Sequence, residues 1–306
     1  MSTTTDAGSP ETFEEHRATL TGVAYRMLGR FADAEDVVQE AWLRWSAADR
    51  SDVRDVRGYL VRVTTRLALD RLRQAQARRE AYVGPWLPEP VATDLARDVA
   101  GRVPDTAERA VLADSVSLAL LVVLESLSPL ERAVFVLREA FGFPYHDIAR
   151  ALDRSEAAVR QLAGRARRHV EERRPRFDVD PARQRALTER FLAAAGGGSL
   201  EDLLELLAPD VRLVGDSGGK AKGPLRVIQG ADKVARFLVA VAAVPLDEPE
   251  LRLAEVNGAL AALLLSAGRP SSVVGLDITD GRITTVYLMR NPDKLAAAVA
   301  GPRRLS

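Results

Sequence analysis

The sequence predicts a multidomain chain in which two all-α domains are followed by an α+β domain with a curved antiparallel sheet. Two patterns carry this prediction. Apolar residues recur at helical spacing between residues 11 and 174, whereas short apolar runs joined by Asn257-Gly258 and Asp280-Gly281 follow residue 181. Amino-acid usage changes at the same place, because all four lysines lie after residue 181 and all three tryptophans lie before it. With 306 residues, the chain is long enough for two or three domains.

The first helical domain is expected over residues 11–79, after a polar tail of residues 1–10. Its most informative segment, DAEDVVQEAWLRW (33–45), combines an acidic start with an apolar face that ends in Trp45. Asp33 is predicted to be the N-cap, and the negative charge of the first turn complements the helix dipole. Taken alone, this pattern fits an ordinary surface helix with a buried aromatic stripe.

A cationic helix is expected next, over residues 56–78. Eight arginines and two aspartates lie between residues 54 and 79, which indicates either a polyanion-binding surface or a solvated helix face. Arg62, Arg66 and Arg73 fall on one side of this helix, opposite its apolar residues.

A linker is expected over residues 80–117. Its segment YVGPWLPEP (82–90) contains three prolines and cannot be a regular helix. Trp86 and Leu87 are apolar within this extended stretch, which fits docking on another surface as well as it fits a linker with incidental hydrophobic residues.

The second helical domain is expected over residues 118–176. Ser128-Pro129-Leu130-Glu131 is a capping box with proline at the first helical position. A short helix over 145–152, a turn, and a helix capped by Ser155 follow, which is the geometry of a helix-turn-helix motif. Eight arginines and three glutamates lie between residues 154 and 176. This charge favours DNA binding over a plain helical hairpin with a basic solvated face.

The last domain is expected over residues 181–306. Asp180-Pro181 and Ser199 mark the starts of two helices, and Asn291-Pro292 marks the start of a final one. The other elements expected from periodicity are a helix over 231–243 and strands over 211–214, 251–256, 260–265, 272–278 and 282–289.

Composition excludes several classes of protein. The formal net charge is zero, so only the local charge clusters bear on nucleic-acid binding. The absence of cysteine excludes disulfides and thiolate metal sites and fits a reducing cytoplasm. The three histidines are scattered without ligand spacing, so no metal site is expected. The polar start lacks the features of a signal peptide, and no apolar run is long enough to span a membrane.

Four segments resemble regions 2 and 4 of extracytoplasmic-function (ECF) sigma factors. They are residues 33–45, GYLVRVTTRLALDRLR (58–73), LSPLERAVFVLRE (127–139) and YHDIARALDRSEAAVRQLAGRARR (145–168). The YVGPWLPEP segment is similar to the linker of the SigJ-like subgroup, whose members carry a C-terminal SnoaL-like domain.

The resemblance implies core RNA polymerase, through its beta-prime clamp and beta subunit, and promoter DNA as partners. The helix over 33–45 would bind the clamp, and its polar edge carries Asp36, Gln39, Glu40 and Arg44. The next helix would engage the minus-10 promoter element through Tyr59, Arg62, Arg66 and Arg73. Tyr59 fits a buried position equally well.

The helix that begins at Ser155 would read the minus-35 element. The residues at its groove-entering end are Ser155, Glu156, Ala158, Arg160 and Gln161. Three arginines further along the helix, Arg165, Arg167 and Arg168, are expected to contact phosphates and to add affinity without sequence choice.

The SnoaL-like part resembles a cone-shaped fold that polyketide cyclases and ketosteroid-isomerase-like enzymes use. Such sites need an acid/base residue and oxyanion donors. After residue 181 there is no histidine, no tryptophan and a single tyrosine, Tyr287. Asp216 is a candidate base, but its segment DSGGK (216–220) fits a turn first. We therefore expect no enzyme and no cofactor, while a small-molecule ligand of this domain stays open.

Two segments of the last domain resemble motifs of the SigJ-like subgroup. DSGGK is similar to a DGGGK-type motif that is implicated in regulation, and NPDKL (291–295) to a second motif; otherwise both are turn and capping sequences. With the linker, they give the residues expected to regulate the protein: Trp86, Leu87, Pro88, Asp216, Gly218, Gly219, Lys220, Asn291, Pro292, Asp293 and Lys294.

The expected function is that of a sigma factor that directs promoter-specific transcription initiation and is modulated in cis by its C-terminal domain. That domain would act on regions 2 and 4 or on the linker around Trp86–Pro90. The alternative is a ligand-responsive helix-turn-helix regulator that acts without polymerase, and a third reading is a cyclase or isomerase with a DNA-binding appendage. The acidic helix over 33–45 favours the first, because a simple repressor has no use for it.

Overall fold

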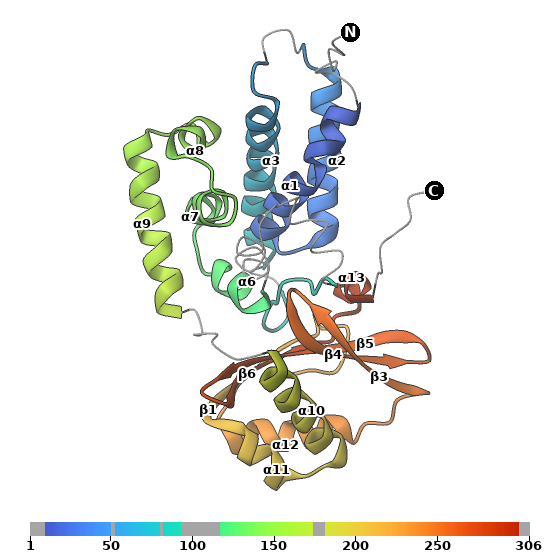
Figure 1. Ribbon diagram of the computed structural model, residues 1–306. Coiled ribbons are helices and arrows are strands. Elements are labelled where there is room, and N and C mark those ends of the chain that lie inside the picture. The colour runs from blue at the N-terminus through green and yellow to red at the C-terminus, as the bar shows by residue number, and fades with distance from the viewer. Residues whose placement is uncertain (1–9, 50–52, 80–81, 93–116, 174–180, 300–306) are drawn as a thin grey trace. The chain divides into compact units, whose positions relative to one another are not determined.

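The computed structural model describes residues 10–49, 53–79, 82–92, 117–173 and 181–299, and the chain forms two compact units (Figure 1). The first unit comprises Met1–Glu80 and Asp94–Arg174, and the second comprises Ala81–Thr93 and Pro175–Ser306. Most of the expected N-terminal tail and more than half of the expected linker lie outside the described residues. The described part of the linker groups with the C-terminal domain and not with the helices on either side of it in sequence.

The first helical domain consists of three packed helices, α1 (Pro10–Leu28), α2 (Phe31–Ala47) and α3 (Val56–Arg79). Trp45 of α2 is fully buried in their core, together with Leu20 and Leu60. The prediction that Asp33 is the N-cap was wrong. The helix begins two residues earlier, and Asp33 lies in its first turn, where its charge still complements the helix dipole.

The second helical domain contains α6 (Leu118–Leu124), α7 (Pro129–Phe135), the π-helical turn η1 (Val136–Ala140), α8 (Tyr145–Leu152) and α9 (Glu156–Arg173). The capping box at Ser128 is confirmed, because its hydroxyl accepts from the Glu131 amide and the Glu131 carboxylate accepts from the Ser128 amide. The helix was expected to reach about residue 139; its last turn is widened into the π form.

The helix-turn-helix geometry of α8 and α9 is also confirmed. Asp153 ends α8 in the left-handed conformation, with φ of 52° and ψ of 56°. The Ser155 hydroxyl then accepts a hydrogen bond from the Ala158 amide at 3.2 Å and caps α9. In Figure 1, α9 lies at the edge of the first unit beside α7 and α8.

The two helical domains pack against each other within the first unit. The fully buried Arg132 of α7 donates to the Met27 carbonyl of α1 at 2.7 Å, to the Leu124 carbonyl at 2.8 Å and to the Glu125 carboxylate at 2.8 Å. Burial lowers the pKa of Arg132 to about 9, so the guanidinium stays protonated at neutral pH. Arg26 is buried as well, and its guanidinium lies 4.9 Å from the Phe141 ring centroid.

The second unit is an α+β domain with a six-stranded sheet in the order β2-β1-β6-β5-β4-β3. The strands are β1 (Leu207–Asp216), β2 (Ile228–Gln229), β3 (Pro249–Val256), β4 (Ala259–Ser266), β5 (Arg269–Thr279) and β6 (Arg282–Met289). Three helices, α10 (Pro181–Gly197), α11 (Leu200–Leu206) and α12 (Ala231–Ala242), cover one face of the sheet (Figure 1). The 3-10 turn η2 (Pro292–Lys294) and α13 (Ala296–Val299) complete the unit, so the helix start expected at Asn291-Pro292 opens a 3-10 turn.

The expectation of an antiparallel sheet was partly wrong, because β1 pairs in parallel with β6. The other four pairings are antiparallel. The hairpin turns at Asn257-Gly258 and Asp280-Gly281 are confirmed, with positive φ at all four residues. Hairpin signals are local, and they predict the antiparallel order of strands that follow one another from β3 to β6. The pairing of β1 with β6 joins strands far apart in sequence, so no local signal predicts it.

The space between the helices and the sheet is filled by apolar side chains from both layers. The buried members include Phe191, Leu203, Val234, Ala262 and Val286. Within the residues that the structure describes, no helix has the length and apolar character needed to cross a bilayer.

Asp153 generates a stability prediction, because left-handed backbone is costly for residues with a branched Cβ. We expect Asp153→Gly to leave the stability of the first unit unchanged or raise it by up to about 1 kcal/mol, and Asp153→Val to lower it by about 1–2 kcal/mol. Thermal unfolding followed by circular dichroism measures both. Arg154→Val is the control at the neighbouring position, which lacks a positive φ. An equal effect of the two valine substitutions would contradict the prediction.

Candidate functional site

The linker is bound to the C-terminal domain along an extended stretch, residues 82–92. Val91 donates its amide to the Asn257 side chain at 3.0 Å, and the Asn257 amide donates to the Val91 carbonyl at 2.8 Å. The Ala92 amide donates to the Ala297 carbonyl at 3.0 Å. The linker backbone thereby forms a single antiparallel bridge, between Ala92 and Val256 at the end of β3.

A buried ion pair holds the middle of this segment. The Lys294 ammonium lies 2.7 Å from the Asp216 carboxylate, and their side chains are 3% and 0% exposed. Asp216 accepts the Leu87 amide at 2.8 Å, and Lys294 donates to the Leu87 carbonyl at 2.6 Å. One residue of the linker thus has both of its peptide groups bound by the two charged groups.

Aromatic side chains of the linker complete the surroundings of the pair. The Tyr82 hydroxyl donates to the second Asp216 oxygen at 2.5 Å. The Lys294 ammonium lies 4.0 Å from the Trp86 ring centroid and 5.1 Å from that of Tyr82, in the range of cation–π attraction. Leu87 itself is fully buried. The linker segment therefore supplies hydrogen bonds, aromatic faces and apolar area to the same site.

The parallel pairing of β1 and β6 explains why these residues meet. The two strands end side by side, so Asp216 at the end of β1 lies next to Asn291, just after β6. The amides of Arg290 and Asn291 donate to the Asp216 carbonyl at 2.7 and 3.0 Å. Asn291 then accepts from the Asp293 amide, and Pro292 starts the turn that directs Lys294 inward.

The glycines of the DSGGK segment are required by a tight turn. The Lys220 amide donates to the Ser217 carbonyl at 2.9 Å, and Gly218 and Gly219 between them have φ of 57° and 71°. A Cβ on Gly218 would lie 2.5 Å from Nδ2, the side-chain nitrogen of Asn291. Ser217 stands at the first turn position, which does not need positive φ. The Lys220 side chain forms an exposed ion pair with Asp293.

All the residues that the sequence marks as regulatory therefore gather around one linker-binding site, which we define as Asp216, Asn257, Asn291 and Lys294 with residues 82–92. Sequence reasoning missed Asn257 and Tyr82. Asn257 was interpreted only as a turn residue, and its side chain also binds the linker.

The polar edge of α2 is solvent-accessible. Asp36 pairs with Arg71 of α3 at 3.0 Å, Glu40 pairs with Arg44 at 2.7 Å, and Gln39 is exposed. Leu43 is 58% exposed and lies seven residues after Asp36, on the same helical face. The helical periodicity does not mark this leucine as a site residue, because it is an apolar residue at a position on the polar face of the helix.

The arginines of α3 that are expected to bind DNA differ in the contacts they already make within the protein. Arg62 lies over the Tyr59 ring at 5.3 Å, and that ring is packed on Trp45 at 5.5 Å. Arg73 pairs with Asp70 at 3.2 Å. Arg66 instead donates to the Ala151 carbonyl of α8 at 3.0 Å, so it bridges the two helical domains.

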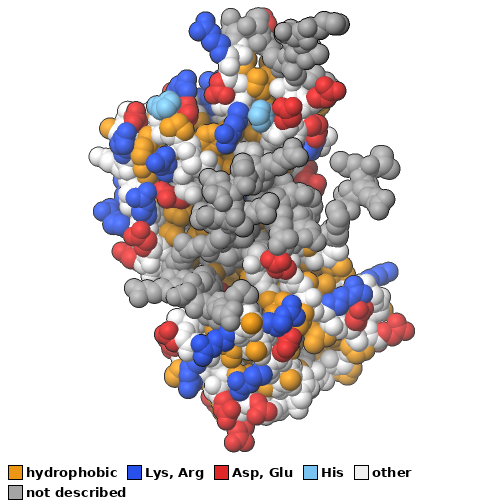
Figure 2. All heavy atoms as spheres, in the orientation of Figure 1, with side chains coloured by type: hydrophobic (Ala, Val, Ile, Leu, Met, Phe, Trp, Pro, Cys, Tyr) orange, Lys and Arg blue, Asp and Glu red, His pale blue; other side chains and the backbone are white. Residues whose placement is uncertain are grey.

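The outer face of α9 is basic, and Figure 2 shows blue arginine side chains gathered over the α8 and α9 part of the first unit. Two of its arginines pair with carboxylates of the preceding helices, Arg165 with Glu131 at 2.9 Å and Arg167 with Glu139 at 2.7 Å. The hydrogen bond that Arg167 donates to the Glu139 carboxylate raises the pKa of Arg167. The other expected DNA-binding residues of this helix are exposed or half-buried: Ser155, Glu156, Ala158, Arg160, Gln161 and Arg168.

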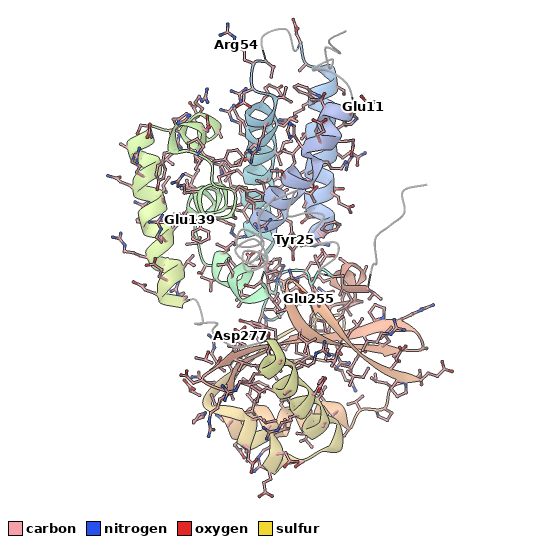
Figure 3. All side chains as sticks on the ribbon, viewed as in Figure 1. Glu11, Tyr25, Arg54, Glu139, Glu255 and Asp277 are labelled. Atoms are coloured by element: carbon pink, nitrogen blue, oxygen red, sulfur yellow. The ribbon has the colours of Figure 1, made fainter. Side chains whose placement is uncertain are left out.

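A second buried acid, Asp277, lies on the sheet of the C-terminal domain, and no sequence pattern marks it (Figure 3). Asp277 of β5 accepts the Tyr287 hydroxyl at 2.6 Å. Burial raises the pKa of Asp277 to about 6, against the smaller opposing effect of that hydrogen bond. The charge on this carboxylate is therefore costly to the fold at neutral pH.

Two sequence profiles match the helical part of the chain and define its class. Sigma-70 region 2 matches residues 12–78, and Sigma-70, region 4 matches residues 117–170. These matches, with the three-helix domain and the helix-turn-helix, are those of a sigma-70-type factor. The alternative of a regulator that acts without polymerase is not favoured.

Relatives that extend over the whole chain narrow the class. The ECF RNA polymerase sigma factor SigJ of Mycobacterium tuberculosis is 41% identical over 95% of this chain and 95% of its own length. The probable ECF RNA polymerase sigma factor SigI of the same species is 39% identical over 94% of this chain and 95% of its own. The crystal structure of M. tuberculosis SigJ superposes with a TM-score of 0.73 and 36% identity, covering 96% of this chain and all of that one. The chain belongs to the extracytoplasmic-function sigma factors.

Asp277 generates a pH prediction. An unfolded aspartate has a pKa of about 3.9, so between pH about 4 and about 6 the folded state holds a proton that the unfolded state has lost. Stability of the second unit should therefore fall as pH rises through this window, by about 3 kcal/mol in total. We expect Asp277→Asn to remove this fall and to be more stable than wild type at pH 7. Opening free energies of β5 and β6 amides from hydrogen exchange measure the effect.

Tyr287→Phe is the matched control for this prediction. It removes the hydrogen bond that lowers the pKa of Asp277, so the window should extend to higher pH. Parallel stability curves for wild type and Asp277→Asn from pH 4 to pH 7 would contradict the assignment.

Proposed function

We propose that this sigma factor is regulated in cis by its C-terminal domain, which captures the linker between regions 2 and 4. The observation that carries the proposal is the binding of both peptide groups of Leu87 by the buried Asp216–Lys294 pair. A buried charge that loses its partners is strongly unfavourable. The pair therefore defines a specific binding position for the linker, and a partly released linker would leave buried charges without hydrogen bonds.

Release of the linker would matter because regions 2 and 4 must reach two promoter elements. In the first unit, Arg66, expected at the minus-10 element, is bonded to the backbone of α8, and Arg132 ties α7 to α1. These contacts support a resting state in which the two regions are packed together. We propose that they separate when the protein engages polymerase and promoter, and that the bound linker opposes this separation.

The polymerase contact is proposed for the exposed polar edge of α2, with Asp36, Gln39, Glu40 and Arg44 around Leu43. An exposed leucine among charged residues is the arrangement that protein interfaces use, with an apolar centre and a polar rim. Its partner would be the beta-prime clamp of core polymerase.

Promoter contacts are proposed for two helices. Tyr59, Arg62, Arg66 and Arg73 of α3 would engage the minus-10 element. The exposed face of α9 would read the minus-35 element. In α9, Arg165 and Arg167 would leave their glutamates for phosphates when DNA binds, and each phosphate contact adds to the dependence of affinity on salt.

The C-terminal domain is proposed to be a binding module and not an enzyme. The space between its helices and sheet is filled by apolar side chains. Asp216, the base that the sequence offers, is neutralised by Lys294 and occupied by the linker. A small molecule that regulates the protein would act by competing with the linker at this site.

The linker-binding site is tested by Asp216→Asn. We expect the Leu87, Val91 and Ala92 amides to exchange faster by two orders of magnitude or more, because a buried lysine left unpaired costs about 3–5 kcal/mol. Hydrogen exchange on the full-length protein measures this. Run-off transcription with core polymerase, on a promoter selected in vitro, is expected to rise as the linker is freed.

Two variants make the test selective. Asp216→Asn combined with Lys294→Met removes both charges and should recover part of the protection. Arg252→Met breaks an exposed pair with Glu250 on β3, away from the linker-binding site, and should change neither readout. Unchanged exchange in Asp216→Asn would refute linker capture, and faster exchange with unchanged transcription would refute its regulatory role.

The polymerase face is tested by Leu43→Ser. Covering this side chain by a partner is worth about 1.5–3 kcal/mol, so affinity for core polymerase should fall by about tenfold or more. Thermal stability should not change, since the side chain is largely exposed in the free protein. Leu251→Ser, at a 53% exposed leucine of the C-terminal domain, is the matched control and should bind normally. Equal affinities for the two variants would exclude Leu43 from the interface.

A further inference from the structure

Tyr145, the first residue of α8, is in contact with two arginines from different elements. The Arg160 guanidinium of α9 lies 4.5 Å from its ring centroid, and that of Arg138 in η1 lies 4.7 Å from it. Arg138 also donates to the Phe143 carbonyl at 3.1 Å. Arg160 forms an ion pair with Glu156, one turn earlier in α9.

We infer that Tyr145 is a positioning residue that fixes the guanidinium of Arg160 for reading a guanine in the minus-35 element. The inference rests on the region 4 match and on the exposed first turns of α9, and it is independent of linker capture. Tyr145 itself does not need to touch DNA.

The geometry suits this role because stacking leaves the donors of arginine available. An arginine presents five N–H groups in one plane, and an aromatic ring contacts the face of that plane. The Glu156 carboxylate is bonded to one terminal nitrogen, Nη2. The remaining edge retains the two donors that a bidentate contact with guanine O6 and N7 requires.

Fixing the side chain also lowers the entropic cost of binding. A long side chain at an exposed helical position samples many rotamers and loses them on recognition. The ring of Tyr145 restricts Arg160 before DNA arrives, and the exposed pair with Glu156 adds a weaker restraint. The Phe143 carbonyl holds Arg138 beside the same ring, which ties the ring to the end of η1.

The later arginines of α9 are held differently. Arg165 and Arg167 are paired with carboxylates and have no aromatic partner among the ring contacts of the described residues. An ion pair on a solvated surface fixes orientation weakly. Arg160, at the groove-entering end, is therefore held by an aromatic ring, whereas Arg165 and Arg167 are suited to phosphate contacts.

The experiment is selection from a duplex library randomised over the minus-35 region, using full-length protein bound to core polymerase. Arg160→Ala first identifies the base pair whose preference depends on Arg160. Tyr145→Leu should then reduce the preference at that base pair by about fivefold to a hundredfold, the range expected for a bidentate contact, and leave the other positions unchanged. Tyr145→Phe keeps the ring and should retain the preference.

The double variant separates positioning from a structural role. If Tyr145 acts through Arg160, Tyr145→Leu has no further effect in the Arg160→Ala background, and the slope of affinity against salt stays the same. Tyr145→Met, closer to the tyrosine in length, repeats the comparison if exchange of α8 amides shows that the leucine variant is unfolded there.

Three results would overturn the inference. They are an Arg160→Ala variant with no altered base preference, a Tyr145 variant that weakens every position equally, and a Tyr145 effect of the same size with and without Arg160. The expected pattern is specific to a residue that orients another, because general destabilisation of α8 would spread over all positions.

Discussion

The second unit depends on the requirement that a buried charge be paired and fully hydrogen-bonded. Asp216 and Lys294 are almost completely removed from solvent, and each also binds the backbone of Leu87. Without the linker, the carboxylate would lose the donors of Leu87 and Tyr82, and the ammonium would lose a carbonyl and two aromatic faces. The linker is therefore a structural part of the C-terminal domain, and the boundary between domains does not follow the order of the sequence.

Topology places the two charges together. Residues at the ends of neighbouring parallel strands lie at the same edge of a sheet, and β1 and β6 are such a pair. The turn through Gly218 and Gly219 then brings the chain away from Asp216 without blocking Asn291. The 3-10 turn after Asn291 returns Lys294 toward the interior. Two short motifs that are far apart in sequence thus act as one site because of a single strand pairing.

Local signals in the sequence predicted local structure well. The capping box at Ser128, the Ser155 cap and the Asn-Gly and Asp-Gly hairpins were all found where the pattern placed them, since each is specified by residues within a few positions. Parallel pairing, the docking of residues 82–92 and the bond from Arg66 to Ala151 join distant segments, and no short-range pattern encodes them. Asp277 shows the same limit, because an aspartate in a strand reads as solvent-facing until the layer that covers it is known. Resemblance to a family supplied the motifs of the linker-binding site, and the structure supplied how they meet.

The linker-binding site captures a segment of its own chain, and this has a consequence for how it responds to its surroundings. The effective concentration of an attached segment is set by the length of the tether and reaches the millimolar range for short connections. Occupancy of the site is then the same in a cell with few copies of the protein as in a cell with many. A competing peptide or small molecule must outweigh this internal concentration through its own concentration and affinity, so a ligand that binds no more tightly than the linker would leave the linker bound at micromolar levels. The competitor concentration needed to displace the linker therefore depends on the length of the tether as well as on the chemistry of the site.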